Sequence, residues 1–455
     1  MSRPIVAVDP NFGPRLRELR DHSRLSLRRL ALLVHCSHGY LWDLEVGKKR
    51  PSTSVAALLD TALGANGTLS AMVRELSADS GERHVVSGLD GTPLGPGLEF
   101  APDWRQAVMT AAELWREDME RRDLIRRIGF SAAAFTAPAM RWLTAPFDDS
   151  PSGTGERLVG EPDIAMVRQI TSVYRTLDNQ FGGGHIRESM VRFLDQEVAG
   201  LLLGRYDVRT GRALLSAAAE ATQLTGWATY DAGMNGLAQA YLVQALRLAA
   251  AAEDRALGAE ILAAMSHQAA YLGAAAEAVD LARAAGRAAA DAGVGAIQAE
   301  SAVLEAHGHA AAGDEAACAR ALDRAERALD RADRTSDPHW IGYFDESYLA
   351  AKFGHCFTTL GRGDLAIRFA ARSLEMDGRR YARGRQFNLA LLAVAHAQTG
   401  DPEQAGAIGA QAVEASEGLR SARARDYLND LANRLAPHVG LPVVQTFAER
   451  LRLRN

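Results

Sequence analysis

Residues 26–52 read SLRRLALLVHCSHGYLWDLEVGKKRPS. Ser26 and Ser37 each precede a run of apolar residues at helical spacing, where a serine hydroxyl can accept a hydrogen bond from a free N–H group of the first turn. Gly47 stands where a left-handed residue ends a helix, and Pro51 follows it. The stretch therefore predicts two short helices, LRRLALLV and HGYLWDLE, joined by a tight turn.

The composition of the whole chain favours helices. Of its 455 residues, 47% are hydrophobic but only 6% are aromatic, and alanine and leucine dominate the apolar share. The residue types that favour strands are sparse. We expect an all-α protein, and its length argues for more than one domain.

The sequence has no sign of a membrane span or of export. No segment approaches the roughly 20 consecutive apolar residues that a span needs, and the N-terminus has no apolar signal region. The three cysteines, Cys36, Cys318 and Cys356, stand far apart and do not form a disulfide framework. We therefore expect a cytoplasmic protein whose cysteines are small core residues.

Positive charge is concentrated near the N-terminus. Residues 11–50 contain nine Lys and Arg against four Asp and Glu, although the whole chain has a formal net charge of −5. A small basic segment on a large acidic body is typical of a nucleic-acid binder with a separate sensory or assembly domain. The alternative is a basic face that is simply solvated.

The residues of this basic segment resemble the Cro/C1-type (XRE) helix-turn-helix family. The family pattern is carried here by Ser26, Leu30, Ala31, Ser37, Tyr40, Leu41, Leu44, Glu45, Gly47 and Arg50-Pro51-Ser52. The resemblance covers residues 12 to about 70 and implies a DNA-binding domain, placed at 10–76, whose second helix lies in the major groove. It also implies that Arg20 and Glu45 form a pair that braces this helix.

Two groups of residues are predicted to contact DNA. On a helix that starts at Ser37, Leu41 and Leu44 share a face and should be buried, so the opposite face should meet the groove. Basic residues of the preceding helix and of the run after Gly47 are placed to contact phosphates, which positions the protein without reading sequence. The predicted DNA-contacting residues are Arg28, Arg29, Ser37, His38, Gly39, Trp42, Asp43, Lys48, Lys49 and Arg50.

A metal site is the alternative for the HCSH stretch. His35, Cys36 and His38 offer suitable ligand atoms, but a structural zinc site needs four ligands and no second pair stands nearby at matching spacing. We favour core packing for Cys36 and expect neither a metal nor a cofactor.

The rest of the chain is predicted to contain a linker, a helical connecting region and a repeat domain. Residues 77–102 are rich in Gly, Pro, Ser and Asp and lack helical periodicity, which is typical of a linker. Residues 103–211 are expected to connect this linker to repeats at 212–455. Turns between paired helices are expected at glycines separated by 40, 40, 48 and 39 residues: Gly233, Gly273, Gly313, Gly361 and Gly400.

Small residues recur at three fixed distances from these glycines. The residues seven positions before the glycines are Gly226, Ser266, Ala306, Gly354 and Ala393. Those five positions after them are Ala238, Ala278, Cys318, Ala366 and Ala405, and those twelve positions after are Ala245, Ala285, Ala325, Ser373 and Ala412. Small side chains let paired helices approach closely. The pattern resembles tetratricopeptide repeats with longer connections and predicts an α-solenoid of helical pairs.

The repeat register predicts which side chains face the concave groove. These candidate effector-binding residues are Trp227, Asp231, His267, Tyr271, His307 and His355. Histidine and aromatic side chains are typical of a binding surface, whereas the alternative is a polar wall that simply stays wet. Because histidine titrates near neutrality, we expect binding to depend on pH.

A DNA-binding segment joined to helical repeats resembles XRE-family regulators with tetratricopeptide-like domains, including peptide-responsive quorum-sensing regulators, and the composition suggests an actinobacterial source. The resemblance implies a homodimer that binds a two-fold operator in double-stranded DNA and responds to a peptide or small-molecule effector. The alternative is a scaffold or adaptor whose repeats bind a protein partner. No nucleophile-base pair or ligand spacing indicates an enzyme.

Overall fold

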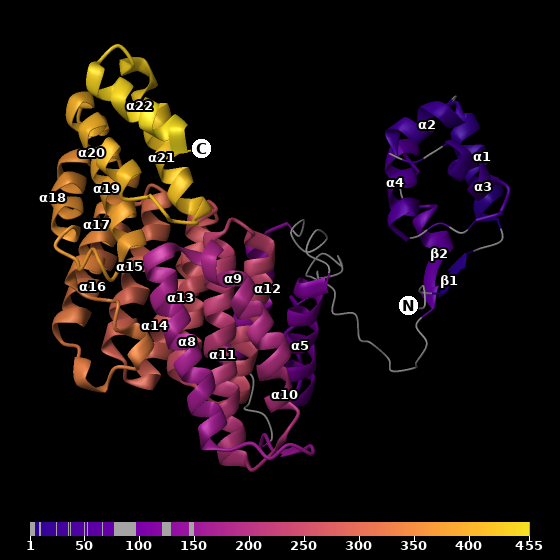
Figure 1. Ribbon diagram of the computed structural model, residues 1–455, viewed down its shortest axis with the longest axis horizontal. Helices are drawn as coiled ribbons and strands as arrows, with labels where there is room; N and C mark the ends of the chain where they lie inside the picture. The colour runs from indigo at the N-terminus through magenta and orange to yellow at the C-terminus, as the bar shows by residue number, and fades with distance from the viewer. Residues whose placement is uncertain are drawn as a thin grey trace. The chain divides into compact units, whose positions relative to one another are not determined.

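Helices make up almost all the regular structure of the computed structural model, which confirms the predicted all-α class (Figure 1). The structure describes residues 5–8, 11–23, 25–34, 36, 38–49, 51, 53–65, 67–76, 97–120, 129–144 and 150–454. The chain divides into two compact units, Met1–Val85 and Val86–Asn455, called here the N-terminal and C-terminal units. Within the described residues, no helix combines the length and apolar character needed to cross a membrane.

The N-terminal unit is a small helical domain with one pair of strands. Its elements are β1 (Ile5–Val8), α1 (Phe12–His22), α2 (Leu27–Leu33), α3 (His38–Glu45), α4 (Thr53–Leu63), the short helix η1 (Ser70–Met72) and β2 (Val73–Leu76). The strands pair antiparallel, with Ile5 opposite Leu76 and Val8 opposite Val73. This pairing was not predicted, because it joins short segments far apart in the sequence and has no hairpin turn to reveal it.

The side chains that hold this unit together are those on the inner faces of its helices. Phe12, Leu16, Leu30, Leu41, Leu44 and Leu59 are buried in one core. Ser26 caps α2 as its hydroxyl accepts a hydrogen bond from the Arg29 N–H at 3.2 Å. The second predicted cap, Ser37, lies outside the described residues. Gly47 has a φ of 71°, as a left-handed residue after α3 requires.

The C-terminal unit begins with elements that precede the repeats. They are α5 (Trp104–Glu120), η2 (Ala132–Phe135), α7 (Thr136–Thr144), β3 (Gly153–Thr154), α8 (Glu161–Phe181), α9 (Gly183–Phe193), a π-helical turn η3 (Leu194–Val198), α10 (Ala199–Leu202) and β4 (Arg205–Tyr206). The predicted linker was too long at its C-terminal end. Leu98 and Phe100 are buried in the core of this unit, and the Gln244 amide donates to the Gly97 and Glu99 carbonyls.

Helical pairs then follow one another to the end of the chain. They are α11 (Val208–Asp231) and α12 (Asn235–Ala251), α13 (Arg255–Tyr271) and α14 (Ala275–Ala292), α15 (Gly295–Ala311) and α16 (Glu315–Asp330), α17 (Glu346–Thr359) and α18 (Gly363–Ser373), α19 (Ala382–Gln398) and α20 (Pro402–Glu414), and α21 (Ala422–Leu435) and α22 (Pro442–Arg454). The five turn glycines all have positive φ, between 71° and 83°. The small residues at the three predicted distances are all buried, which is what close approach of the helices requires.

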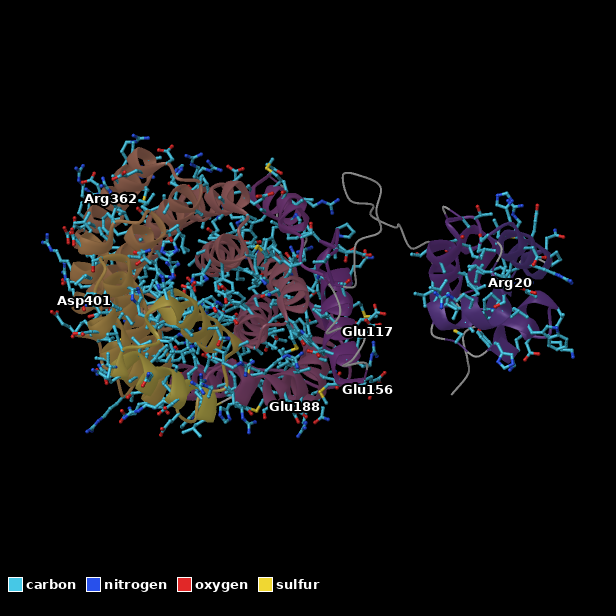
Figure 2. All side chains as sticks on the ribbon, turned by 90° about the horizontal axis from the view of Figure 1, so that it is seen from above. Arg20, Glu117, Glu156, Glu188, Arg362 and Asp401 are labelled. Atoms are coloured by element: carbon cyan, nitrogen blue, oxygen red, sulfur yellow. The ribbon has the colours of Figure 1, made fainter. Side chains whose placement is uncertain are left out.

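The first helices of the pairs form a closed ring with α8. Around this ring, each of the inner helices α8, α11, α13, α15, α17 and α19 contacts the next, and α19 contacts α8 again. The main chain seals the junction, because the Arg420 N–H donates to the Phe181 carbonyl at 2.8 Å and the Gly184 N–H donates to the Arg420 carbonyl at 2.9 Å. Seen from above, the yellow C-terminal helices accordingly lie beside the magenta α8 and α9 (Figure 2). The array of helical pairs confirms the predicted α-solenoid, and α19 returns to contact α8.

Gly13 allows α1 to approach the end of α3. A Cβ atom at this position would lie 2.5 Å from the Glu45 carbonyl oxygen and 2.7 Å from that of Leu44. Backbone atoms cannot yield as a flexible side chain can. The sequence did not single out this glycine, since a glycine in the first turn of a helix has several possible reasons.

We predict that Gly13→Ala destabilises the N-terminal unit by roughly 1–3 kcal/mol, the usual cost of overpacking. Gly39→Ala is the matched control, because Gly39 also lies near the start of a helix but its added Cβ meets no atom within 4 Å. That control should gain roughly 0.5–1 kcal/mol, since alanine restricts the unfolded chain. Hydrogen exchange of the α1–α3 amides in the full-length protein measures both, and equal protection in the two variants would contradict the prediction.

Candidate functional site: a cavity and a basic surface

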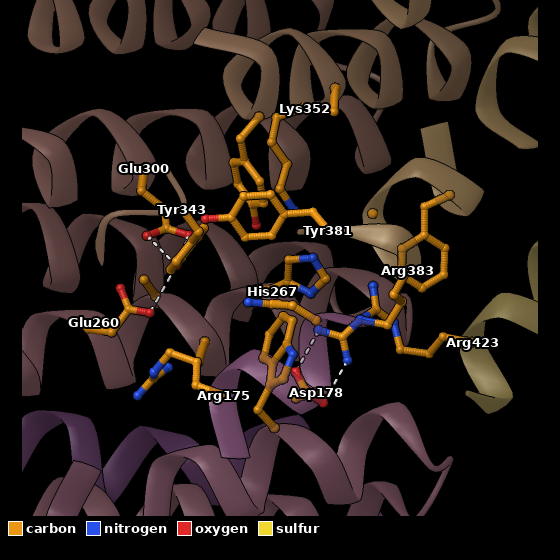
Figure 3. Close-up of a pocket in the computed structure, with 18 of the residues that line it drawn as sticks. Arg175, Asp178, Glu260, His267, Glu300, Tyr343, Lys352, Tyr381, Arg383 and Arg423 are labelled. Carbon is orange, nitrogen blue, oxygen red and sulfur yellow. Dashed lines mark hydrogen bonds and ion pairs between the residues drawn. The ribbon is translucent and has the colours of Figure 1, made fainter. Parts of the chain in front are cut away.

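The closed ring surrounds a cavity of about 420 Å³. Its wall is formed by α8, the inner helices of the repeats, α21 and the segment 339–345 (Figure 3). Of the predicted effector-binding residues, the wall includes Trp227, His267, Tyr271, His307 and His355. The repeat register thus brings together side chains that are up to 128 positions apart in the sequence.

Asp231, the remaining predicted residue, does not line the cavity. Its carboxylate is fully buried and accepts hydrogen bonds from the Gly183 N–H and the Ser421 hydroxyl, each at 2.9 Å. It also lies 3.3 Å from the Arg383 guanidinium. The helical register placed Asp231 one turn beyond Trp227, but there the chain meets α9 and the start of α21, so the residue has a structural role.

Arg383 joins three elements of the ring through buried charges. Its guanidinium donates to both carboxylate oxygens of Asp178, at 2.9 and 2.7 Å, and so links α19 to α8, while Asp231 contributes the contact from α11. Burial alone would lower the pKa of Arg383, but attraction to the two carboxylates outweighs it and the pKa is raised. Arg383 therefore stays charged and holds α8 in the ring.

Arg423 is enclosed by aromatic rings. Its guanidinium carbon lies 4.5 Å from the ring centre of Tyr230, 5.0 Å from that of Phe387, 5.3 Å from that of Tyr271 and 5.5 Å from that of Trp227. Such cation–π contacts are strongest where water is excluded. They fix Arg423 at one end of the cavity, and its Nε atom is buried without a hydrogen-bond partner among the described residues.

Two carboxyl groups meet at the other end of the cavity. The Tyr343 hydroxyl lies 3.0 Å from Oε1 of Glu260 and 2.9 Å from Oε1 of Glu300, and Figure 3 shows it between them. A hydroxyl has one hydrogen to donate, so the Tyr343 hydroxyl can fully satisfy only one of the two carboxyl groups at a time. Burial raises the pKa of both groups, and repulsion by Glu260 raises that of Glu300 further.

Lys352 lies between these two ends. It is 94% buried, its Nζ atom is 5.1 Å from the ring centre of Tyr348, and in the described structure no carboxylate lies within ion-pair distance of it. Burial, together with repulsion by Arg423, lowers the pKa of the lysine to about 7, against a weaker opposite effect of Glu300. This amine therefore changes its charge near neutral pH.

The histidines of the wall do not titrate near neutrality as the sequence suggested. Burial lowers the pKa of His307 to about 3 and those of His267 and His355 well below their usual value. The Nε2–H group of His307 donates to the Lys352 carbonyl at 3.1 Å. The three imidazoles are therefore neutral hydrogen-bonding groups, and Lys352 is the group whose charge responds to pH.

Several residues of the wall were not predicted, although the sequence contains signals for two of them. The 48-residue spacing between Gly313 and Gly361, against 39 or 40 residues elsewhere, reflects an insertion that carries Tyr343 into the cavity. Lys352 is the only lysine after residue 49. The pair of Asp178 and Arg383 has no such signal, because Asp178 lies on α8, outside the repeats, and the repeat register cannot place it beside Arg383.

The exposed face of α3 is the second candidate site. His38, Gly39 and Trp42 are exposed, whereas Leu41 and Leu44 are buried, so the helix has the orientation that its register predicts. Arg29 is exposed on α2. The side chain of Arg28 and the residues Ser37 and Arg50 lie outside what the structure describes.

The two lysines after α3 pack back onto it. The Lys48 ammonium lies 4.6 Å from the Trp42 ring centre, and the Lys49 ammonium lies 3.0 Å from the Asp43 carboxylate. Their N–H groups donate to the Asp43 carbonyl at 2.8 and 3.1 Å. Asp43 is thus engaged with Lys49, and the contacts hold the lysines beside the exposed face of the helix.

Arg20 and Glu45 join α1 to the end of α3. The Arg20 guanidinium donates to both Glu45 oxygens, at 2.6 and 3.1 Å, and also to the Leu25 carbonyl at 3.0 Å. The hydrogen bond to Glu45 raises the pKa of Arg20, despite the opposite effect of burial. Cys36 is half-buried against the core of this unit, whereas His35 lies outside the described residues; those that are described contain no group of three His, Cys, Asp or Glu able to hold a metal ion.

Residues 11–72 match the family model of a helix-turn-helix domain. The match covers α1 to α4 and η1, and α2 and α3 lie where the sequence predicts the two helices of the motif. No curated protein matches the chain. The helix-turn-helix domain thus accounts for the basic surface, and it says nothing of what the C-terminal unit binds.

Lys352 makes a testable contribution to stability. Between its folded pKa of about 7 and its usual value of 10.5, the unfolded chain binds one more proton than the folded chain at this site. The cost of burying the ammonium is therefore complete below pH 7 and is relieved as pH rises. We predict that Lys352→Met is more stable than the wild type at pH 7, and that the difference shrinks by roughly 1.4 kcal/mol per pH unit above it.

Urea unfolding of the full-length protein, followed by circular dichroism from about pH 7 to about pH 9, measures this difference. Arg362→Met is a matched control, because Arg362 is an exposed cation on the outside of the same unit, paired with Glu315 (Figure 2). Its stability should change with pH in parallel with the wild type. A parallel profile for Lys352→Met as well would show that the pKa of the lysine is not lowered.

Proposed function

We propose that the protein is a sequence-specific DNA-binding transcriptional regulator that acts as a homodimer on a two-fold operator. The observation that carries this proposal is the helix-turn-helix match at residues 11–72, combined with the exposed face of α3. In this arrangement α3 lies in the major groove, and Arg29, Lys48 and Lys49 contact phosphates. Two such domains held one DNA turn apart, ~34 Å, can bind both half-sites at once.

The cavity of the C-terminal unit is the proposed site of control. A peptide or small-molecule effector that binds there more tightly in one dimer arrangement than in the other changes the affinity for DNA. A coupling free energy of roughly 1–3 kcal/mol changes that affinity about 5- to 150-fold. Arg423 Nε and Glu260 Oε2 are buried and have no hydrogen-bond partner among the residues that the structure describes, which supports a binding role, since such groups are otherwise satisfied in protein interiors.

Lys48 provides the test of phosphate contact. We predict that Lys48→Ala lowers the affinity for DNA equally on operator and unrelated sequences, and that it reduces the slope of log affinity against log salt by about 0.9, the value for one phosphate contact. The measurement is fluorescence anisotropy with DNA from upstream of the protein's own gene. Arg362→Ala, on the outside of the C-terminal unit, is the control and should leave the slope unchanged.

His38 provides the complementary test of base recognition. Because His38 is exposed on α3, we predict that His38→Ala lowers the preference for operator over unrelated DNA by roughly 1–3 kcal/mol and leaves the salt slope intact. The same titrations on both DNAs measure this. If neither Lys48→Ala nor His38→Ala alters binding, α3 and its basic run do not form the DNA-binding surface.

A further inference from the structure

The size of the cavity limits what it can hold. Contact of α19 with α8 closes the ring, and the segment 339–345 adds a wall that the regular repeats lack. A volume of about 420 Å³ lies in the lower half of the usual range for small-molecule sites, roughly 300–1,000 Å³. The cavity therefore has the size of a site for a small organic molecule.

Lys352 gives the cavity an uncompensated positive charge. Arg383 is paired with Asp178 and Arg175 with Glu220, but the Lys352 ammonium is buried with no carboxylate within 4 Å among the described residues. An unpaired buried charge is costly, so an anion in the cavity would supply the missing partner.

The groups that surround Lys352 do not replace that partner. Those that face it or act on it electrostatically are His267 on α13, Glu300 and His307 on α15, Tyr348, His355 and Cys356 on α17, and Arg423 on α21. The imidazoles are neutral. Glu300 raises the pKa of Lys352 but forms no ion pair with it among the described residues, and Arg423 adds a like charge that lowers this pKa.

The ends of the cavity indicate the rest of the ligand. Around Arg423, the rings of Trp227, Tyr271 and Phe387 offer flat apolar surface. At the opposite end, Glu260 is 94% buried and its Oε2 atom has no partner in the described structure. A ligand with a flat body and a hydrogen-bond donor would satisfy both ends.

We propose that the cavity binds a small organic anion with a flat, aromatic or similarly apolar body, and that Lys352 holds its anionic group. This inference rests on the proposed function in that it assigns the chemical class of the effector. Its molecular basis is independent of DNA, so it can be tested without an operator.

Two fluorescent probes of nearly the same shape separate charge from apolar contact. Anilinonaphthalene sulfonate carries an anionic group, whereas phenylnaphthylamine has the same ring system without it. We expect the full-length protein to bind the sulfonate saturably at one site per chain. Lys352→Met should weaken sulfonate binding at least tenfold, because a charge-assisted contact contributes about 1.5–3 kcal/mol, and should change phenylnaphthylamine binding by less than about twofold.

Two further variants locate the probes. Ala311 lines the cavity and is exposed, so Ala311→Trp adds bulk there without displacing the core and should abolish binding of both probes. Arg362→Met removes an exposed cation on the outside and should change neither. In the wild type, sulfonate affinity should also fall roughly fivefold from pH 7 to pH 8, as the Lys352 ammonium loses its proton.

The proposal is overturned if the wild type does not bind the sulfonate, if Lys352→Met weakens both probes equally or neither, or if sulfonate binding survives Ala311→Trp. None of these outcomes depends on DNA binding, so they would disprove the anion site without disproving the proposed role as a DNA-binding regulator. Conversely, probe binding as expected in a protein that fails the Lys48 and His38 tests would keep the anion site and remove the proposed function.

Discussion

The C-terminal unit depends on a buried ion pair that closes a ring. Helical repeats ordinarily stack along a line, each contacting only its neighbours. Here the Arg383 guanidinium pairs with Asp178 of α8 and approaches Asp231 of α11, so the fifth helical pair is joined both to α8, which precedes the repeats, and to the first pair. Removing one member of such a buried pair usually costs roughly 3–5 kcal/mol, because the other charge is left uncompensated. Without this closure the inner helices would line an open groove, and the groups that now surround the cavity would face water.

Closure also explains the unusual protonation of the cavity. Lys352, His267 and His307 would have ordinary pKa values on an open groove, but within the ring burial lowers the pKa of each. Glu300 responds in the opposite direction and gains a proton. The interior thus excludes charge wherever no partner is available. Arg383 stays charged there because Asp178 is beside it. The pKa of Lys352 is left near 7, so a bound anion would determine whether the lysine is charged at neutral pH.

The sequence predicted what repeats and missed what does not. Glycine turns and small residues at fixed distances revealed the helical pairs, and the same register identified Trp227, His267 and His307 as neighbours, because helical geometry fixes which positions share a face. Closure by α8 could not be inferred, since it depends on the curvature accumulated over five pairs. The same limit applies to β1 and β2, which pair across the whole N-terminal unit. The register was wrong for Asp231. It placed this side chain in the groove, but at the edge of the array α9 and the start of α21 cover it.

The use of lysine connects the two candidate sites. The chain has 51 Lys and Arg, yet only Lys48, Lys49 and Lys352 are lysines. Arginine suits the structural pairs, because its planar guanidinium engages both oxygens of a carboxylate and does not lose its proton, as at Arg20 and Arg383. An ammonium is instead a compact charge whose pKa shifts readily on burial. Beside the exposed helix α3 that property matters little, and a point charge serves for phosphate contact. Inside the ring it matters most, because an arginine at position 352 would remain charged whether or not an anion was bound, whereas the lysine can lose its charge when the cavity is empty.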